Sequence, residues 1–66
     1  MEVFKVELGP KVFSVVGIAN IVKGTVRFQA LINDIPFAQN SDYQAIREVL
    51  LTAVELNRPE KQEGVQ

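Results

Sequence analysis

Residues 12–32, VFSVVGIANIVKGTVRFQALI, contain two strand-like runs on either side of a glycine turn. The runs cover 12–22 and 25–32 and are rich in β-branched residues, which favour strands. Lys23-Gly24 separates them and has the form of a two-residue hairpin loop with glycine at its second position. The stretch therefore predicts an antiparallel hairpin.

A two-residue loop would fix which residues lie opposite each other in this hairpin. We expect Ile21 to lie opposite Val26 and Val15 to lie opposite Ile32. In that register one face of the hairpin is almost wholly apolar, while the other face mixes polar and apolar side chains. A slip of one residue would mix the two faces, so the pattern favours this sorting of side chains.

One further strand is expected before the hairpin. Residues 3–8 alternate apolar and charged side chains, with Phe4, Val6 and Leu8 on one face. Gly9-Pro10 follows directly and breaks the run.

A fourth strand is expected after the hairpin. Asn33-Asp34 predicts a second tight turn, because both residue types tolerate positive φ. The strand would cover residues 35–39, with Ile35 and Phe37 facing inward. Proline cannot donate to a sheet ladder, so Pro36 predicts a short strand or one at an edge. If Pro36 ends the sheet instead, three strands remain.

A single helix follows the strands. Ser41 and Gln44 have the spacing of a capping box, with Ser41 as the N-cap, and Asn57 and Pro59 should end the helix. Apolar residues at helical spacing form one stripe: Tyr43, Ile46, Val49, Leu50, Ala53, Val54 and Leu56. We expect this stripe to cover the sheet and to pack against three aromatic side chains, Phe4, Phe28 and Phe37.

These elements predict an α+β fold, in which a four-stranded antiparallel meander, or a three-stranded one, is followed by one C-terminal helix packed on the sheet. Residues 1–57 would form this single ββββα domain. Residues 58–66 are polar and contain proline and glycine, so we expect a flexible tail.

Composition excludes several classes of protein for this chain of 66 residues. It contains no cysteine, which excludes a disulfide framework and fits a reducing compartment. It begins without the basic and apolar segments of a signal peptide, and no stretch approaches the roughly 20 apolar residues of a membrane span. We therefore expect a soluble cytoplasmic protein with no membrane partner.

The side chains that usually perform catalysis are scarce. Histidine and cysteine are both absent, which removes imidazole bases, thiolate nucleophiles and ordinary zinc sites. The acidic residues are spread over a strand, a turn and the helix, so paired carboxylates in one cleft are not expected. We expect no catalytic residue, no metal site and no cofactor, and therefore a protein that is not an enzyme.

The outward face of the hairpin is the first candidate binding surface. Val16, Ile18 and Leu31 should lie on it, with Asn20 and Arg27 as a polar rim. Exposed apolar patches usually mark interfaces, so we expect a homodimer or higher oligomer that also binds another protein, as an adaptor, inhibitor or regulator. Such a role would suit a phage or mobile-element accessory protein. Alternatively, the tail or the N-terminal strand folds over this patch.

Single-stranded nucleic acid is the second candidate partner. The expected sheet and helix are similar in outline to a class of dimeric single-strand-binding proteins, although no motif residue of that class occurs here. Lys5, Lys11, Lys23 and Arg27 lie on the strands or turns and could meet phosphates. The net charge of −1 and the inward assignment of the aromatic residues argue against this alternative.

Overall fold

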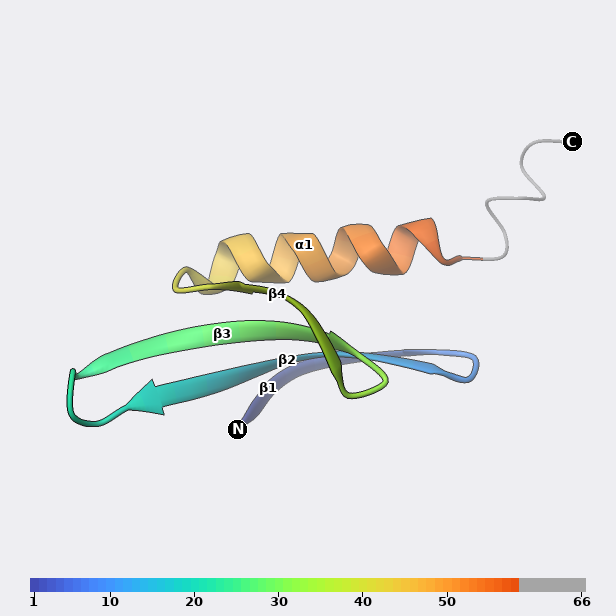
Figure 1. The fold of residues 1–66 in the computed structure, drawn as a ribbon. Coiled ribbons are helices and arrows are strands. Elements are labelled where there is room, and N and C mark those ends of the chain that lie inside the picture. The colour runs from blue at the N-terminus through green and yellow to red at the C-terminus, as the bar shows by residue number, and fades with distance from the viewer. Residues whose placement is uncertain (59–66) are drawn as a thin grey trace, which may run out of the picture.

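A computed structural model describes residues 1–58 and contains an antiparallel sheet with a helix across one face (Figure 1). The elements in chain order are β1 (Glu2–Leu8), β2 (Lys11–Asn20), β3 (Thr25–Ile32), β4 (Ile35–Asn40) and α1 (Tyr43–Leu56). The strands lie in the order β1-β2-β3-β4, which confirms the predicted α+β meander with its C-terminal helix. The fourth strand is present, so the three-stranded alternative is wrong. Of the predicted tail, residues 59–66 lie outside the described residues.

Two of the three strand connections are tight turns at the positions that the sequence predicts. Gly9-Pro10 joins β1 to β2, and Gly9 has a φ of 61°, which glycine adopts without steric cost. Asn33-Asp34 joins β3 to β4 with φ values of 51° and 70°. Positive φ at both central residues defines a type I′ turn, whose twist matches that of the flanking strands.

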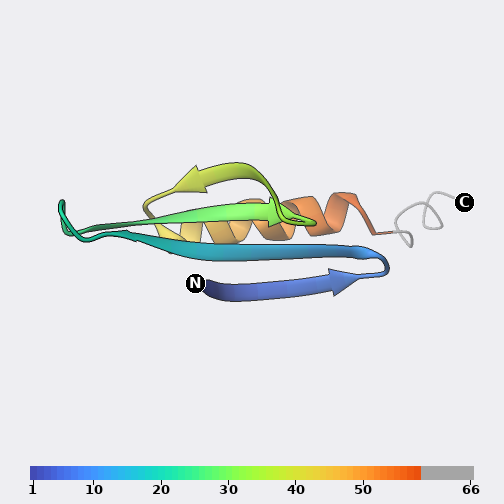
Figure 2. The ribbon, with the colours of Figure 1, turned by 60° about the horizontal axis from the view of Figure 1, so that its bottom comes forward.

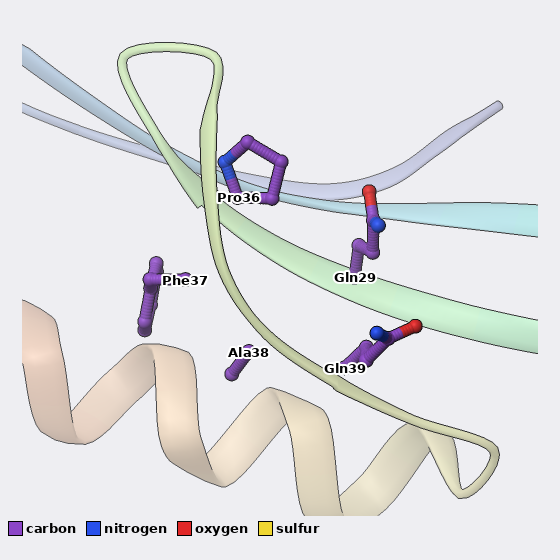
Figure 3. A pocket seen from close by; sticks show the side chains of 5 residues that line it. All are labelled: Gln29, Pro36, Phe37, Ala38 and Gln39. Carbon is purple, nitrogen blue, oxygen red and sulfur yellow. The ribbon is translucent and has the colours of Figure 1, made fainter.

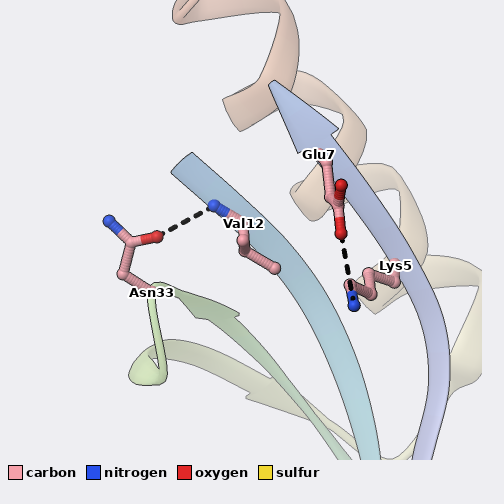
Figure 4. A network of polar contacts seen from close by, with 4 residues as sticks. All are labelled: Lys5, Glu7, Val12 and Asn33. Atoms are coloured by element: carbon pink, nitrogen blue, oxygen red, sulfur yellow. Dashed lines mark hydrogen bonds and ion pairs between the residues drawn. The ribbon is translucent and has the colours of Figure 1, made fainter. Parts of the chain in front are cut away.

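Asn33 stabilises its turn through its side chain as well as its backbone. Its Oδ1 accepts a 2.8 Å hydrogen bond from the Val12 amide (Figure 4). Its own amide donates to the Val12 carbonyl at 2.8 Å. The turn is therefore tied to the start of β2.

We expect Asn33→Ala to lower the free energy of unfolding by about 1–2 kcal/mol, because alanine resists positive φ and lacks the side-chain acceptor. Asn33→Gly is the matched control, since it permits the φ of 51° but removes the same hydrogen bond. Urea denaturation followed by circular dichroism should place the glycine variant between the wild type and the alanine variant. Equal losses in both variants would show that backbone conformation contributes little here.

The connection between β2 and β3 differs from the prediction, because it is a four-residue loop over 21–24 with Asn20 opposite Thr25. Gly24 is the only loop residue with positive φ, at 67°. The loop thereby avoids the steric cost that Lys23 would meet at positive φ in a two-residue turn. Two hydrogen bonds to Asn20 support it, from the Gly24 amide to the carbonyl at 2.8 Å and from the Lys23 amide to Oδ1 at 3.0 Å.

The predicted register of the hairpin is consequently wrong by two residues. Val15 lies opposite Ala30, not opposite Ile32. Because side chains alternate with a period of two, this shift leaves every side chain of the paired strands on its predicted face. Ile21 and Val22, however, lie in the loop and are 92% and 96% exposed, not paired within the sheet.

The core lies between the sheet and α1. The fully buried apolar side chains are Phe13 and Val15 of β2, Ala30 of β3, and Ile46, Leu50 and Val54 of α1. Ile46, Leu50 and Val54 belong to the predicted helical stripe, and Phe4 and Phe28 pack against this cluster as predicted.

Ile35 pairs with Ile32 on the helix side of the sheet, as predicted, but neither Ile35 nor Phe37 is buried, because their side chains are 68% and 42% exposed. Figure 1 shows the β3–β4 turn curving away from the helix, so β4 begins far from the core and approaches α1 only toward its end. Phe37 is also the extra residue of a bulge, since Leu31 pairs with Pro36 while Ala30 pairs with Ala38. Phe13, not Phe37, is therefore the largest buried side chain.

Helix α1 begins one residue later than predicted. Asp42 is the N-cap, not Ser41, and its carboxylate accepts a 3.1 Å hydrogen bond from the Gln44 amide. Aspartate caps as well as serine does, and its negative charge also interacts favourably with the helix dipole. At the other end Lys11 Nζ donates to Asn57 Oδ1 at 2.7 Å, which ties the start of β2 to the end of the helix.

Candidate functional site

The sheet has one face that no described segment covers, and we call it the outer face (Figure 2). The pairing register places these side chains on it: Glu2, Lys5 and Glu7 of β1; Val12, Ser14, Val16, Ile18 and Asn20 of β2; Thr25, Arg27, Gln29 and Leu31 of β3; Pro36 and Gln39 of β4. Figure 2 shows the strands in front of the helix in this view, so the outer face and the core lie on opposite sides of one sheet.

All five side chains of the predicted interface lie on the outer face. Val16 and Ile18 follow one another along β2, and Leu31 is diagonal to Val16 on β3. Ile18 is 47% exposed, while Val16 and Leu31 are half-buried by their neighbours in the sheet. Of the polar rim, Asn20 supports the hairpin loop, and Arg27 Nη1 donates to Gln39 Oε1 at 3.2 Å.

The N-terminal strand does not cover this patch, so that part of the alternative is wrong, whereas the predicted cover by the tail concerns residues 59–66, which lie outside the described residues. Strand β1 pairs beside β2 at the edge of the sheet and does not cross it. Its outer-face side chains include an ion pair of 3.3 Å between Lys5 Nζ and Glu7 Oε2, with both side chains exposed (Figure 4). Such surface pairs contribute about 0–1 kcal/mol, so Lys5 and Glu7 remain available to an incoming partner.

The tip of the β2–β3 hairpin is an exposed apolar surface that the sequence analysis did not predict. The hairpin extends beyond the N-terminal start of α1 (Figures 1 and 2), and its loop exposes Ile21 and Val22 almost fully. Val26 beside the loop is 48% exposed. Asn20 could have indicated this loop. It is a turn-forming residue four positions before Gly24, and that spacing suits a four-residue loop.

The four cations proposed to contact nucleic acid do not share one face. Lys5 pairs with Glu7 and Arg27 donates to Gln39 on the outer face. Lys11, in contrast, bonds to Asn57 at the end of the helix, and Lys23 lies in the hairpin loop.

The described part of the outer face also lacks an aromatic side chain. Phe4 and Phe28 pack against the core on the helix side. Phe28 meets Tyr43 there, edge to face, with ring centroids 5.4 Å apart. This face therefore offers no ring on which a base could stack.

The surface of residues 1–58 includes two shallow hollows. One has a volume of about 380 Å³ and is lined by Gln29, Pro36, Phe37, Ala38 and Gln39 (Figure 3). Figure 3 shows Pro36 on the side of β4 away from the helix and Phe37 on the helix side. The other, of about 370 Å³, is lined by Ala45, Glu48, Val49 and Thr52 on α1. Neither brings together a pair of groups for acid–base chemistry.

Residues 1–58 contain neither a candidate metal site nor a helix that could cross a membrane. No group of three or more acidic side chains within this range is placed to hold a metal ion. No helix within it combines the length and the apolar character needed to cross a membrane.

No model of a known protein family matches the chain, and no curated protein and no solved structure matches it either.

Proposed function

We propose that this chain is a small, non-enzymatic protein-binding module that associates with further copies of itself through its outer face. As an adaptor, inhibitor or regulator in the cytoplasm, it would act by occupying protein surface, not by chemistry. The observation that carries the proposal is the placement of Val16, Ile18 and Leu31 on two neighbouring central strands, with no described segment over them.

The outer face differs in composition from the solvated face of an ordinary antiparallel sheet. An antiparallel sheet with one solvated face normally carries polar side chains there. Here three aliphatic side chains are interspersed with polar ones, since Val16 lies opposite Gln29, Ile18 opposite Arg27 and Leu31 opposite Ser14. Burial of such aliphatic surface is favourable by about 25 cal/mol per Å². Lys5, Glu7 and Arg27 carry both signs of charge on the same face, so a second copy related by a two-fold axis can place cations against carboxylates.

The nucleic-acid alternative has less support, because its four cations are dispersed and the outer face has no aromatic side chain among the described residues. The two proposals predict different responses of binding to salt. Binding through Lys5 and Arg27 would weaken steeply with salt, whereas association through aliphatic side chains would not. A single-stranded oligonucleotide at low and high salt is therefore included in the test below.

We expect Ile18→Asp to halve the molar mass measured by light scattering, because a carboxylate at the centre of an apolar contact would have to be desolvated without a partner. The variant should stay folded, since Ile18 is 47% exposed and lies outside the core. Ile35→Asp is the matched control. It makes the same change at a residue that is 68% exposed but pairs with Ile32 on the helix side.

Three results would count against the proposal. A folded Ile18→Asp protein with the wild-type mass would show that the outer face makes no self-contact. Loss of the circular dichroism spectrum in this variant would place Ile18 in the core. An oligonucleotide complex that dissociates as salt rises would favour the nucleic-acid alternative.

A further inference from the structure

The two edges of the sheet differ in their capacity to accept another strand. On β4, Ile35 pairs with Ile32 across the turn, so the backbone nitrogen of Pro36 faces the free edge and has no hydrogen to donate. The bulge at Phe37 interrupts the same edge. The bulge on β1 is at Val3, next to the N-terminus, and leaves Phe4–Leu8 regular. The β1 edge is therefore the open one.

Hydrogen-bond geometry identifies which groups of β1 face outward. Leu8 of β1 and Lys11 of β2 flank a two-residue turn, so the backbone groups of these two residues bond to each other. Alternation then directs the backbone groups of Phe4 and Val6 toward β2 as well. The amides and carbonyls of Lys5 and Glu7 point to the free edge, where residues 1–58 provide no partner strand.

Charge selects one register for pairing with a second copy. Residues that lie opposite each other in a sheet project their side chains to the same face. The registers that keep the helix sides of both copies on one face of the joined sheet therefore differ by steps of two residues. With the two-fold axis at Val6, Lys5 lies opposite Glu7 of the second copy, and Glu7 lies opposite its Lys5. A step in either direction places Lys5 opposite Lys5 or Glu7 opposite Glu7, which is repulsive.

We propose that two copies of the chain pair antiparallel through the free edges of their β1 strands, around a two-fold axis at Val6. The two four-stranded sheets then form one continuous sheet of eight strands with both helices on the same side. This contact uses the edge of the sheet and shares only Lys5 and Glu7 with the outer face, and the joined sheet presents two outer faces side by side.

The apolar side chains on the helix side of β1 also match one another in this register. Phe4, Val6 and Leu8 are half-buried beside the core, at the margin of the region that α1 covers. Pairing places Val6 against Val6 of the second copy and Phe4 against its Leu8, so apolar side chains meet apolar side chains. Arg47 already lies over the Phe4 ring, with its guanidinium carbon 5.1 Å from the centroid, and would border this joined strip.

Reversal of single charges tests the register. In Lys5→Glu, carboxylates face one another twice across the axis, and in Glu7→Lys, ammonium groups do. Each variant should raise the dissociation constant of the edge contact roughly tenfold to a hundredfold. An equimolar mixture of the two variants should pair again, because both carboxylates of the Lys5→Glu chain then lie opposite ammonium groups of the Glu7→Lys chain.

The mixture shows whether a charge reversal acts on the contact between copies or on the ion pair within one chain. Both variants lose the internal Lys5–Glu7 ion pair, and mixing cannot restore an intrachain contact. We would build the reversals into the Ile18→Asp protein, which lacks the proposed outer-face contact, and measure molar mass by light scattering. The expected masses are two chains for the parent, one for each reversal and two for the mixture, each chain being 7.4 kDa.

Three outcomes would overturn the edge contact: a monomeric folded parent, a dimeric single reversal, or a mixture that stays monomeric. The outer-face proposal fails independently, if Ile18→Asp leaves the wild-type mass unchanged. A wild type of four chains that becomes two in Ile18→Asp supports both contacts, and a monomeric wild type rejects both.

Discussion

Replacement of Phe13 by alanine is expected to lower the free energy of unfolding by about 3–5 kcal/mol. The Phe13 side chain is 0% exposed and is the largest in the buried cluster, so its removal leaves a cavity between the sheet and α1. Phe37→Ala is the matched control. The Phe37 side chain is 42% exposed and lies outside that cluster, so we expect a loss of no more than about 1 kcal/mol. Urea denaturation of both variants gives the comparison.

A loss of this size is severe for so small a chain. Domains are stable by about 0.05–0.15 kcal/mol per residue, which is roughly 3–10 kcal/mol for 66 residues. The Phe13→Ala protein should therefore be partly unfolded at 25 °C. If Phe37→Ala proved as costly as Phe13→Ala, Phe37 would belong to the core, as the alternating sequence pattern indicated.

The strands and the helix could be predicted because their signals are local. Alternation over residues 3–8 and helical spacing from Ile46 to Val54 depend only on which neighbours share a face. The sorting of the hairpin into two faces survived an error in loop length, because a shift of two residues preserves the side-chain period. The predicted members of the outer face were therefore placed correctly, although their partners across the strands were not.

Features that depend on twist and on backbone hydrogen bonding could not be predicted in the same way. Phe37 alternates with Ile35 as a buried side chain should, but the bulge and the curvature of β4 leave both exposed. Ser41 and Asp42 are equally good caps, so the sequence alone does not choose between them. The open β1 edge also required structural knowledge, since the bulge at Val3 is not visible in the alternation.

The core and the two proposed association surfaces thus occupy different parts of the sheet. The core lies on one face of the sheet, the outer face lies on the other, and the β1 edge continues both. Because these regions share few side chains, substitutions in one should add independently to substitutions in another. This separation makes stability and association measurable as different properties of the same chain.

Leu50→Ala tests that separation and is expected to lower the free energy of unfolding by about 2–5 kcal/mol. Leu50 is 0% exposed in the middle of α1, where its side chain packs on the sheet. Leu56→Ala makes the same chemical change on the same helix at a side chain that is 76% exposed. We expect this control to unfold within about 0.5 kcal/mol of the wild type in urea.

The molar mass of the Leu50→Ala protein should nevertheless equal that of the wild type, at the same concentration and at a temperature where it remains folded. Neither proposed contact includes Leu50, because the outer face lies across the sheet and the edge contact uses Phe4–Leu8. Ile18→Asp should show the converse, a reduced mass with little loss of stability. A Leu50→Ala protein that dissociates while its circular dichroism spectrum stays native would mean that helix packing controls the association surfaces, and the two properties would then be coupled.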